Sequence, residues 1–232
     1  MEIAPSVHHV RLLGVDTFII AEPERPVTLI DAGMFWSRSP IERHLRRIGR
    51  RQDEIERIVC THGHPDHVGG IRRLLRGRSD VAVLMHSADI AGLRISLRQA
   101  LRRTDGGVAR RVRLLDLLTR APERLQPIED GDEIPVLGGL KVVHTPGHTP
   151  GSICLFAPRH RLLFAGDVLQ VIRGRLTYAN AFFSHDIGQA RATLARLAEL
   201  DVETIAMAHY RPWRDHAALA LRALVAGSTP PR

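Results

Sequence analysis

The sequence predicts a layered α/β domain, and three observations support this fold class. Short apolar runs typical of buried strands alternate along the chain with stretches whose apolar residues recur at helical spacing. These elements form two comparable halves, and each half carries histidine and aspartate residues directly after a strand. The 232 residues suffice for one large core, and no linker-like segment interrupts them. We therefore expect a single domain over residues 1–232.

The first half of the chain is expected to begin with a hairpin and to continue as alternating strands and helices. Residues 7–20 alternate loosely between apolar and polar, and a glycine-containing turn at 14–16 favours a hairpin. The apolar run over 27–30 delivers Asp31 at its end, and Gly33 permits a sharp exit of the chain. The elements expected next are a helix over 39–48, a strand over 55–61, a helix over 68–76 and a strand over 81–85.

The second half repeats the alternation of strands and helices. Its first strand-like stretch, over 125–136, turns at Gly131-Asp132, and a later hairpin is expected to turn at Pro158-Arg159. The elements expected in this half are strands over 140–144, 152–156, 161–165 and 203–208, with helices over 186–200 and 213–226.

Four potential metal ligands gather at the end of the strand expected over 55–61. His62, His64, Asp66 and His67 fall within six positions, at a strand-to-helix turn. Their side chains should therefore meet at one edge of a sheet. Imidazole and carboxylate groups together suit Zn, Fe or Mn far better than Ca or Mg. This stretch predicts a metal site.

Later strands end at further candidate ligands. His148 lies in Thr-Pro-Gly-His-Thr-Pro-Gly-Ser, Asp167 in Leu-Phe-Ala-Gly-Asp, and His209 in Ile-Ala-Met-Ala-His. With Asp31 and the His-x-His-x-Asp-His run, these motifs resemble, in order, those of the metallo-β-lactamase fold superfamily. The resemblance covers about residues 7–225. It implies an αββα four-layer sandwich, in which two mixed β-sheets face each other with helices outside.

The resemblance also implies a role for each candidate ligand. Two divalent metal ions are expected, with Zn as the default and Fe or Mn as alternatives. Asp31 would stand behind the ligands and orient one of them. The first ion would be bound by His62, His64 and His148, and the second by Asp66, His67 and His209, with Asp167 bridging both.

A hydrolase follows from this ligand set. A hydroxide held between the two ions would cleave an ester, lactone or thioester of a small substrate. Asp66 would orient the hydroxide and pass a proton to the leaving group. Two other functions fit the same residues, namely a metal-dependent phosphodiesterase or nuclease, and a metal-binding regulatory protein with little turnover. The presence of both Asp66 and Asp167 favours hydrolysis.

The substrate is left open by the sequence. The chain is similar to the glyoxalase II and lactonase-like branch, and most of all to small bacterial hydrolases of unassigned substrate. It lacks the Cys-Gly-Arg motif that glyoxalase-type thioesterases carry after the bridging aspartate. Gln170 stands where acyl-homoserine lactonases place a tyrosine.

Bulky side chains near the expected site are candidates either for substrate contact or for simple packing. They come from the loop after Asp31, from residues 176–184 and from the position after His209. The candidates are Phe35, Trp36, Tyr178, Phe183 and Tyr210.

Residues 88–120 predict a helical insertion that does not match the core pattern of the fold. Leu93, Leu97 and Leu101 are spaced for one helical face, and arginines occupy much of the remainder. Lactonase-like relatives use an insertion here as a cap or an interface. We therefore expect a cap over the metal site or a homodimer contact, with a solvated helical hairpin as the alternative.

The composition indicates neither a membrane protein nor a nucleic-acid-binding protein. No stretch approaches the roughly 18 apolar residues of a membrane span, and the N-terminus does not resemble a signal peptide. The formal charge is +8, but Lys141 is the only lysine, so the arginines fit a compositional bias. Aromatic residues are not interleaved with them, so nucleic acid is not expected as a partner. Cys60 and Cys154 lie in apolar runs and favour a reduced, cytoplasmic setting.

Overall fold

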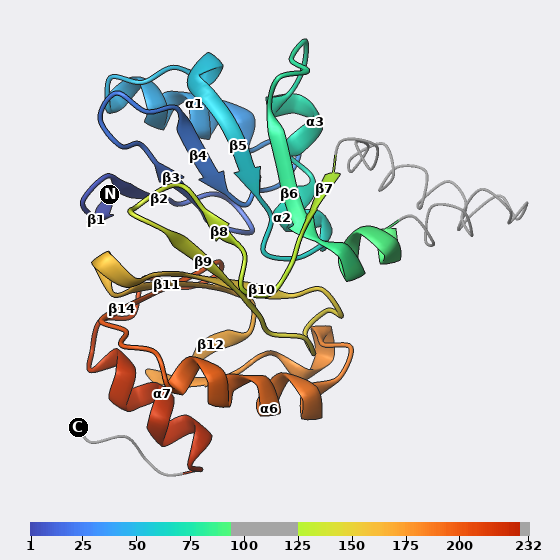
Figure 1. Cartoon of the computed structure of the whole chain (residues 1–232), viewed down its shortest axis with the longest axis vertical. Helices are drawn as coiled ribbons and strands as arrows, with labels where there is room; N and C mark the ends of the chain where they lie inside the picture. The colour runs from blue at the N-terminus through green and yellow to red at the C-terminus, as the bar shows by residue number, and fades with distance from the viewer. Residues whose placement is uncertain (94–124, 228–232) are drawn as a thin grey trace, which may run out of the picture.

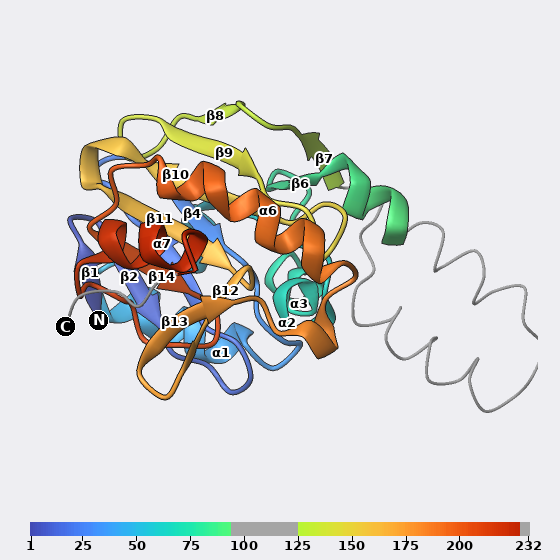
Figure 2. The ribbon, with the colours of Figure 1, turned by 90° about the horizontal axis from the view of Figure 1, so that it is seen from below.

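Two β-sheets face each other between outer layers of helices in the computed structural model, which describes residues 1–93 and 125–227 (Figure 1). Helices α1 and α3 lie on the outer side of the first sheet. Figure 2 shows α6 and α7 lying across the outer side of the second sheet. The αββα four-layer sandwich expected from the resemblance is therefore confirmed.

The first sheet, within the described residues, has seven strands whose spatial order follows the sequence. Neighbours from β1 to β4 are antiparallel, and those from β4 to β7 are parallel. Val7 of β2 pairs with Ile20 of β3, so the expected first hairpin is confirmed. The strands are β1 (Glu2–Ala4), β2 (Val7–Val10), β3 (Thr17–Ile20), β4 (Val27–Ile30), β5 (Ile55–Val59), β6 (Ala82–His86) and β7 (Leu125–Ile128).

The second sheet has the order β14-β11-β10-β9-β8 in the described part of the chain. Its neighbours are antiparallel except for the parallel pair β11 and β14. A separate two-stranded hairpin, β12 with β13, follows β11. The bounds are β8 (Glu133–Ile134), β9 (Leu140–His144), β10 (Ile153–Ala157), β11 (Leu162–Gly166), β12 (Leu169–Ile172), β13 (Arg175–Tyr178) and β14 (Thr204–Met207).

The helices cover the outer faces of the sheets. A further helix begins at residue 87 and is described to residue 93. The α-helices with complete bounds are α1 (Arg38–Arg47), α2 (Pro65–Val68), α3 (Ile71–Leu74), α6 (Ile187–Ala198) and α7 (Ala217–Val225). Short 3-10 turns are η1 (Gln52–Glu54), η2 (Pro158–His160) and η3 (Ala181–Phe183).

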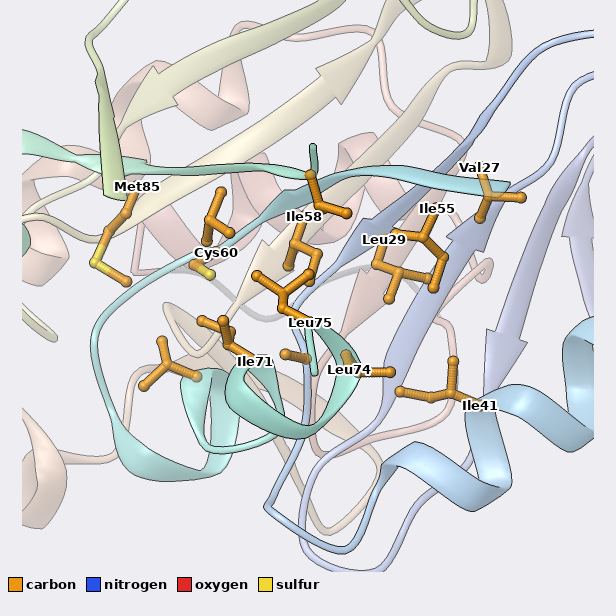
Figure 3. Close-up of a cluster of buried hydrophobic side chains, with 14 of the residues drawn as sticks. Val27, Leu29, Ile41, Ile55, Ile58, Cys60, Ile71, Leu74, Leu75 and Met85 are labelled. Carbon is orange, nitrogen blue, oxygen red and sulfur yellow. The ribbon is translucent and has the colours of Figure 1, made fainter. Parts of the chain in front are cut away.

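Apolar side chains fill three buried layers. The first lies between the first sheet and α1 and α3, where Leu29 and Ile41 are buried (Figure 3). Phe18 and Phe164 meet edge to face in the layer between the sheets, with ring centroids 5.3 Å apart. Leu194 belongs to the third layer, between the second sheet and α6 and α7. Because both faces of each sheet are covered, strands such as β4 and β11 are buried along their whole length.

The single helix expected over 68–76 is wrong in its bounds, because the structure has two short helices there. Pro65 begins α2, and α3 starts after Gly69 and Gly70. A Cβ atom on Gly70 would lie 2.0 Å from the carbonyl oxygen of Ala32. The backbone therefore passes too close to the exit of β4 for a side chain. The Gly70 N–H donates to the Gly33 carbonyl over 2.8 Å instead of to the preceding helical turn, so the helix is interrupted.

Two other local expectations differ from the structure. The last helix begins at Ala217 and not at Trp213, because the backbone of Trp213 pairs with Ile205 of β14. The β12–β13 hairpin was not predicted. Its turn, Arg173-Gly174, has positive φ at both residues, as in a tight two-residue hairpin turn.

The expected insertion over 88–120 falls largely on residues 94–124, which lie outside the described residues. Its role as a cap or an interface stays a prediction. Among the helices that are described, none has the length and the apolar character needed to cross a lipid bilayer.

Candidate metal centre

Five segments that follow strands bring the predicted ligands to one edge of the two sheets. The segment after β5 carries the His-x-His-x-Asp-His run, and the loop between β9 and β10 carries His148. Asp167 follows β11, His209 follows β14, and Asp31 follows β4. All seven predicted ligands meet here, in three groups whose donor atoms lie within 4.8 Å of one another.

His62, His64 and His148 form what we call the first cluster. His62 Nε2, His64 Nδ1 and His148 Nε2 lie 3.0 to 3.2 Å from one another. Nitrogen ligands of one tetrahedral zinc ion, each about 2.0–2.1 Å from the metal, are about 3.3 Å apart. The three imidazoles therefore fit a single metal ion.

Asp66, His67 and His209 form the second cluster. Asp66 Oδ2 lies 3.8 Å from His67 Nε2 and 3.5 Å from His209 Nε2. The Asp66 and His209 side chains are about one-third exposed, whereas His67 is fully buried. This second donor set is thus more open than the first and mixes carboxylate with imidazole.

Asp167 lies between the two clusters. Its Oδ2 is 3.6 Å from His148 Nε2 in the first cluster and 3.1 Å from His209 Nε2 in the second. Its Oδ1 is 3.4 Å from His67 Nε2. One carboxylate therefore faces donor atoms of both clusters.

Two buried polar atoms between the clusters indicate whether these residues suit a cation. His67 Nε2 and Asp167 Oδ1 have no hydrogen-bond partner among the described residues. His67 Nδ1 donates to Asp31 Oδ2 over 2.8 Å, so the neutral ring presents a lone pair at Nε2. Buried polar atoms are rarely left without a partner. A divalent metal ion would accept both lone pairs, so the residues fit a metal.

Burial dominates the electrostatics of the first cluster. It lowers the pKa of His64 and lowers that of His62 well below the usual range. It also lowers the pKa of His148 to about 4. The three rings are therefore neutral near pH 7, the form in which an imidazole binds metal.

Negative charge dominates the second cluster. Burial opposes protonation of His67, but Asp31 and Asp167 on either side raise its pKa well above the usual range. The hydrogen bond to Asp167 raises the pKa of His209. Without metal, these two imidazoles therefore retain protons at a higher pH than those of the first cluster.

Asp31 orients ligands of both clusters through hydrogen bonds. Besides the bond from His67, its carboxylate accepts hydrogen bonds from the Thr61 backbone N–H at 2.8 Å and from the Thr61 hydroxyl at 2.9 Å. The same hydroxyl lies 3.2 Å from His62 Nδ1. Asp31 is 1% exposed and has a φ of +61°. It therefore orients His67 directly and His62 through Thr61.

Two more ligands are fixed through their second ring nitrogen. His148 Nδ1 lies 3.3 Å from the hydroxyl of Ser184, which donates to the Asn180 carbonyl. His209 Nδ1 donates to the carbonyl oxygen of Gly14 over 2.8 Å. Each bond places the proton on Nδ1 and leaves Nε2 for the metal.

Asp89 is a structural support that sequence reasoning missed. Its carboxylate accepts hydrogen bonds from the Gly63 N–H at 2.7 Å, the Gly151 N–H at 2.7 Å and the Thr149 hydroxyl at 2.8 Å. It therefore ties together the two loops that carry the first cluster. The available signal was a carboxylate in the first turn of the helix that follows β6, the parallel strand next to β5. Thr61 was missed as well, although it adjoins the ligand run.

A cavity of about 580 Å³ opens over the metal ligands. A ligand-sized space of this kind, with polar groups at its base, suits a small molecule. Its walls are formed by His64, Asp66, His148, Asp167 and His209, together with Met34, Pro65, Leu169, Gln170, Asn180, Phe183 and Tyr210.

Only part of the predicted substrate-contact set lines this cavity. Phe183 and Tyr210 are in its wall, and Phe35, Trp36 and Tyr178 are not. Sequence patterns could not separate these two groups, because all five are aromatic residues on segments near the ligands.

The three residues outside the wall are engaged elsewhere. Phe35 packs edge to face on Trp36, with ring centroids 4.5 Å apart. Trp36 Nε1 donates to the Leu13 carbonyl over 3.1 Å. The Tyr178 hydroxyl donates to the Leu224 carbonyl over 2.7 Å, so Tyr178 packs β13 on α7.

Comparison with known proteins is consistent with this geometry. The family described as the metallo-beta-lactamase superfamily matches residues 10–209. The Bacillus subtilis protein "Probable metallo-hydrolase YflN" is 28% identical over 228 residues, which are 91% of this chain and 86% of that protein. The Gallus gallus "Acyl-coenzyme A thioesterase MBLAC2" is 38% identical over 123 residues, which are 48% of this chain and 40% of that protein.

The fold itself is shared with solved structures. A metallo-beta-lactamase family protein from Thermus thermophilus superposes with a TM-score of 0.68. The superposition covers 97% of this chain and 80% of that protein, at 22% identity.

Proposed function

Because the chain belongs to the metallo-β-lactamase superfamily and is a metal-dependent hydrolase, we propose that it cleaves a thioester, ester or lactone of a small molecule with two metal ions. The position of Asp167 carries this proposal, because its carboxylate faces His148 on one side and His67 and His209 on the other. Carboxylates in such positions bridge ions about 3.5–4 Å apart. Zn is the proposed metal because it readily accepts a histidine-rich tetrahedral set, and Fe or Mn would accept the same groups.

The residues of the cavity have distinct roles in the proposed hydrolysis. When bound, the metal ions lower the pKa of a coordinated water towards about 7 and polarise the substrate carbonyl. Asp66 is part of the cavity wall, so its carboxylate can orient that water and carry its proton to the leaving group. The Tyr210 hydroxyl lies 3.5 Å from Gln170 Oε1 in the same wall and can donate to the substrate.

Exposed apolar side chains beside the cavity support a substrate with an apolar acyl part. Phe183 lines the cavity while remaining 61% exposed, and its neighbour Phe182 is 88% exposed. Leu13 is 79% exposed, and its carbonyl accepts a hydrogen bond from the half-exposed Trp36. Both residues lie on loops next to the second cluster. Exposed apolar groups around a cavity are typical of ligand-binding sites. An acyl thioester has an apolar acyl chain that these side chains can contact, and its thioester bond can be hydrolysed at this site.

We also propose a small-molecule substrate, a homodimer and a cytoplasmic location. A small molecule is proposed over nucleic acid because the cavity over the metal ligands has the size of a small-molecule site. A homodimer through residues 88–120 also stays a proposal, because most of that segment lies outside the described residues. Cys60 and Cys154 are free and buried in separate cores, which supports a reducing cytoplasm.

A substrate panel with metal analysis tests the proposed function. The purified protein is assayed on acyl thioesters, esters, lactones, β-lactams and phosphodiesters, before and after chelation, and its metal content is measured by emission spectrometry. We expect two metal equivalents per chain and hydrolysis of an acyl substrate that chelation abolishes and Zn restores. Turnover of phosphodiesters alone would favour the nuclease alternative. A fully loaded protein with no turnover would favour a regulatory one.

A further inference from the structure

A second cavity, of about 530 Å³, lies where β2, α1 and the segment after β14 meet. In Figure 2 the N-terminal strands and α1 lie near each other, and α1 contacts β2. Four arginines line this cavity, and we call it the arginine pocket. They are Arg11, Arg43, Arg47 and Arg211.

The guanidinium groups of these four arginines carry no hydrogen-bond or ion-pair partner within residues 1–93 and 125–227. Several other surface arginines are paired with carboxylates, as Arg38 is with Glu42 over 2.7 Å. A cavity that gathers unpaired arginines has a strongly positive potential, which attracts anions.

Two carboxylates on the same segments are already engaged. Asp16 accepts hydrogen bonds from His9 Nε2 at 2.6 Å and from the Leu12 N–H at 3.0 Å. Glu42 is held by Arg38 on α1. Neither carboxylate is therefore left to neutralise the arginines.

His44 provides an independent observation within the same cavity. It lines the arginine pocket, is only 8% exposed, and its Nε2 has no hydrogen-bond partner among the described residues. Burial, followed by the positive groups around it, lowers the pKa of His44 to about 4. Buried polar atoms are rarely left without a partner, so a bound group would complete the contacts of this nitrogen. The positive surroundings indicate that this group is negatively charged.

We propose that the arginine pocket binds a phosphate-bearing ligand, with Arg43, Arg47 and His44 among its contacts. Guanidinium groups bind phosphate oxygens through paired, charge-assisted hydrogen bonds, which makes phosphate a better match than a carboxylate of lower charge. Consecutive residues line the two cavities, because Tyr210 is in the wall of the metal cavity and Arg211 is in the wall of the arginine pocket. The phosphate can therefore belong to the leaving group of the substrate or to a separate ligand.

Adjacent arginines on α1 provide a matched pair of variants for the test. Both are exposed, but Arg47 lines the pocket and Arg46 does not. Inorganic phosphate is titrated into the metal-loaded protein by calorimetry at constant ionic strength. We expect Arg47→Gln to weaken binding at least about tenfold, the loss for one charge-assisted hydrogen bond, and Arg46→Gln to change it less than about twofold.

The NMR signal of His44 provides a second measurement, independent of calorimetry. The side-chain NMR resonances of His44 should shift on phosphate addition in the wild-type protein and shift less in Arg47→Gln. Equal effects of Arg46→Gln and Arg47→Gln, or binding that leaves the His44 resonances unmoved, would overturn the proposal.

A kinetic comparison identifies the source of the phosphate, and this comparison rests on the proposed function. One acyl group is offered on a thiol that carries phosphates and on an uncharged thiol. If the phosphate belongs to the substrate, Arg47→Gln raises KM for the first thioester alone. If it belongs to a separate ligand, both KM values are unchanged while phosphate binding is still weakened. Failure of both thioesters to react would count against the proposed function and leave the binding result intact.

Discussion

The two metal clusters are built from similar residues but are prepared for metal in different ways. In the first, one ring nitrogen from each of three histidines lies within 3.2 Å of the others, and burial keeps the rings neutral. In the second, carboxylates surround the imidazoles of His67 and His209 and raise their pKa. The first site therefore needs no proton to leave before metal binds, whereas the second exchanges protons for metal. Changes that act on one cluster should therefore leave the other largely unaffected.

The largest expected effect separates metal binding from turnover. Asp66→Asn removes the carboxylate that orients water, so kcat should fall by about 10²- to 10⁴-fold. The first cluster contains no Asp66 atom and should keep its metal. Turnover is compared with metal content measured on the same preparation, with Asp215→Asn, an exposed carboxylate elsewhere, as the control. Turnover like that of the wild type would remove Asp66 from the mechanism.

Acidification should empty the second cluster before the first. The raised pKa of His67 and His209 means that protons compete with metal at a higher pH there than at His148, whose pKa is about 4. Affinity of the second cluster should fall about tenfold per pH unit for each proton displaced. Metal content is followed by dialysis from about pH 8 to about pH 5. Simultaneous loss of both ions would contradict the difference between the clusters.

Removing the supports should weaken the clusters selectively. Asp31→Asn alters the partner of His67 directly and should lower metal affinity of the second cluster by about 10- to 100-fold. Asparagine tolerates the positive φ at this position, so the turn should persist. Thr61→Val keeps that partner but removes the hydroxyl beside His62, so its effect should fall mainly on the first cluster. Competition with a coloured chelator measures both affinities.

The smallest effect concerns burial of a histidine away from the metals. The folded-state pKa of His44 is about 4, below its ordinary value of 6.5, so the unfolded chain binds more protons between these values. Its contribution to stability is therefore complete above about pH 6.5 and is lost as the pH falls towards 4, by about 1–2 kcal/mol. Urea unfolding of the metal-free protein at about pH 7.5 and 4.5 should show a smaller difference in His44→Asn than in the wild type.

Much of the fold was predictable because buried strands in this architecture are short apolar runs. The strands at 27–30 and 140–144 have the expected bounds, since both sheets are covered on both faces. The ligands were predictable for a different reason. Three histidines and an aspartate within six residues are an uncommon pattern, and the motifs at the ends of later strands match, in order, those of the metallo-β-lactamase superfamily.

The remaining residue roles depend on contacts that the spacing of residues along the sequence does not encode. Asp89 matters because it accepts hydrogen bonds from the backbones of Gly63 and Gly151, which are far apart in the chain. Tyr178 resembled a cavity residue, and only the position of α7 reveals where its hydroxyl bonds. Such roles follow from how distant segments meet, so no local pattern could have assigned them.

Asp89 also determines how the two histidine-bearing loops move relative to each other. It lies in the helix that begins at residue 87 and is described to residue 93. Its carboxylate accepts hydrogen bonds from Gly63 in one loop and from Thr149 and Gly151 in the other. A displacement of this helix would therefore carry both loops together, whereas loss of the carboxylate would let His62 and His148 shift independently.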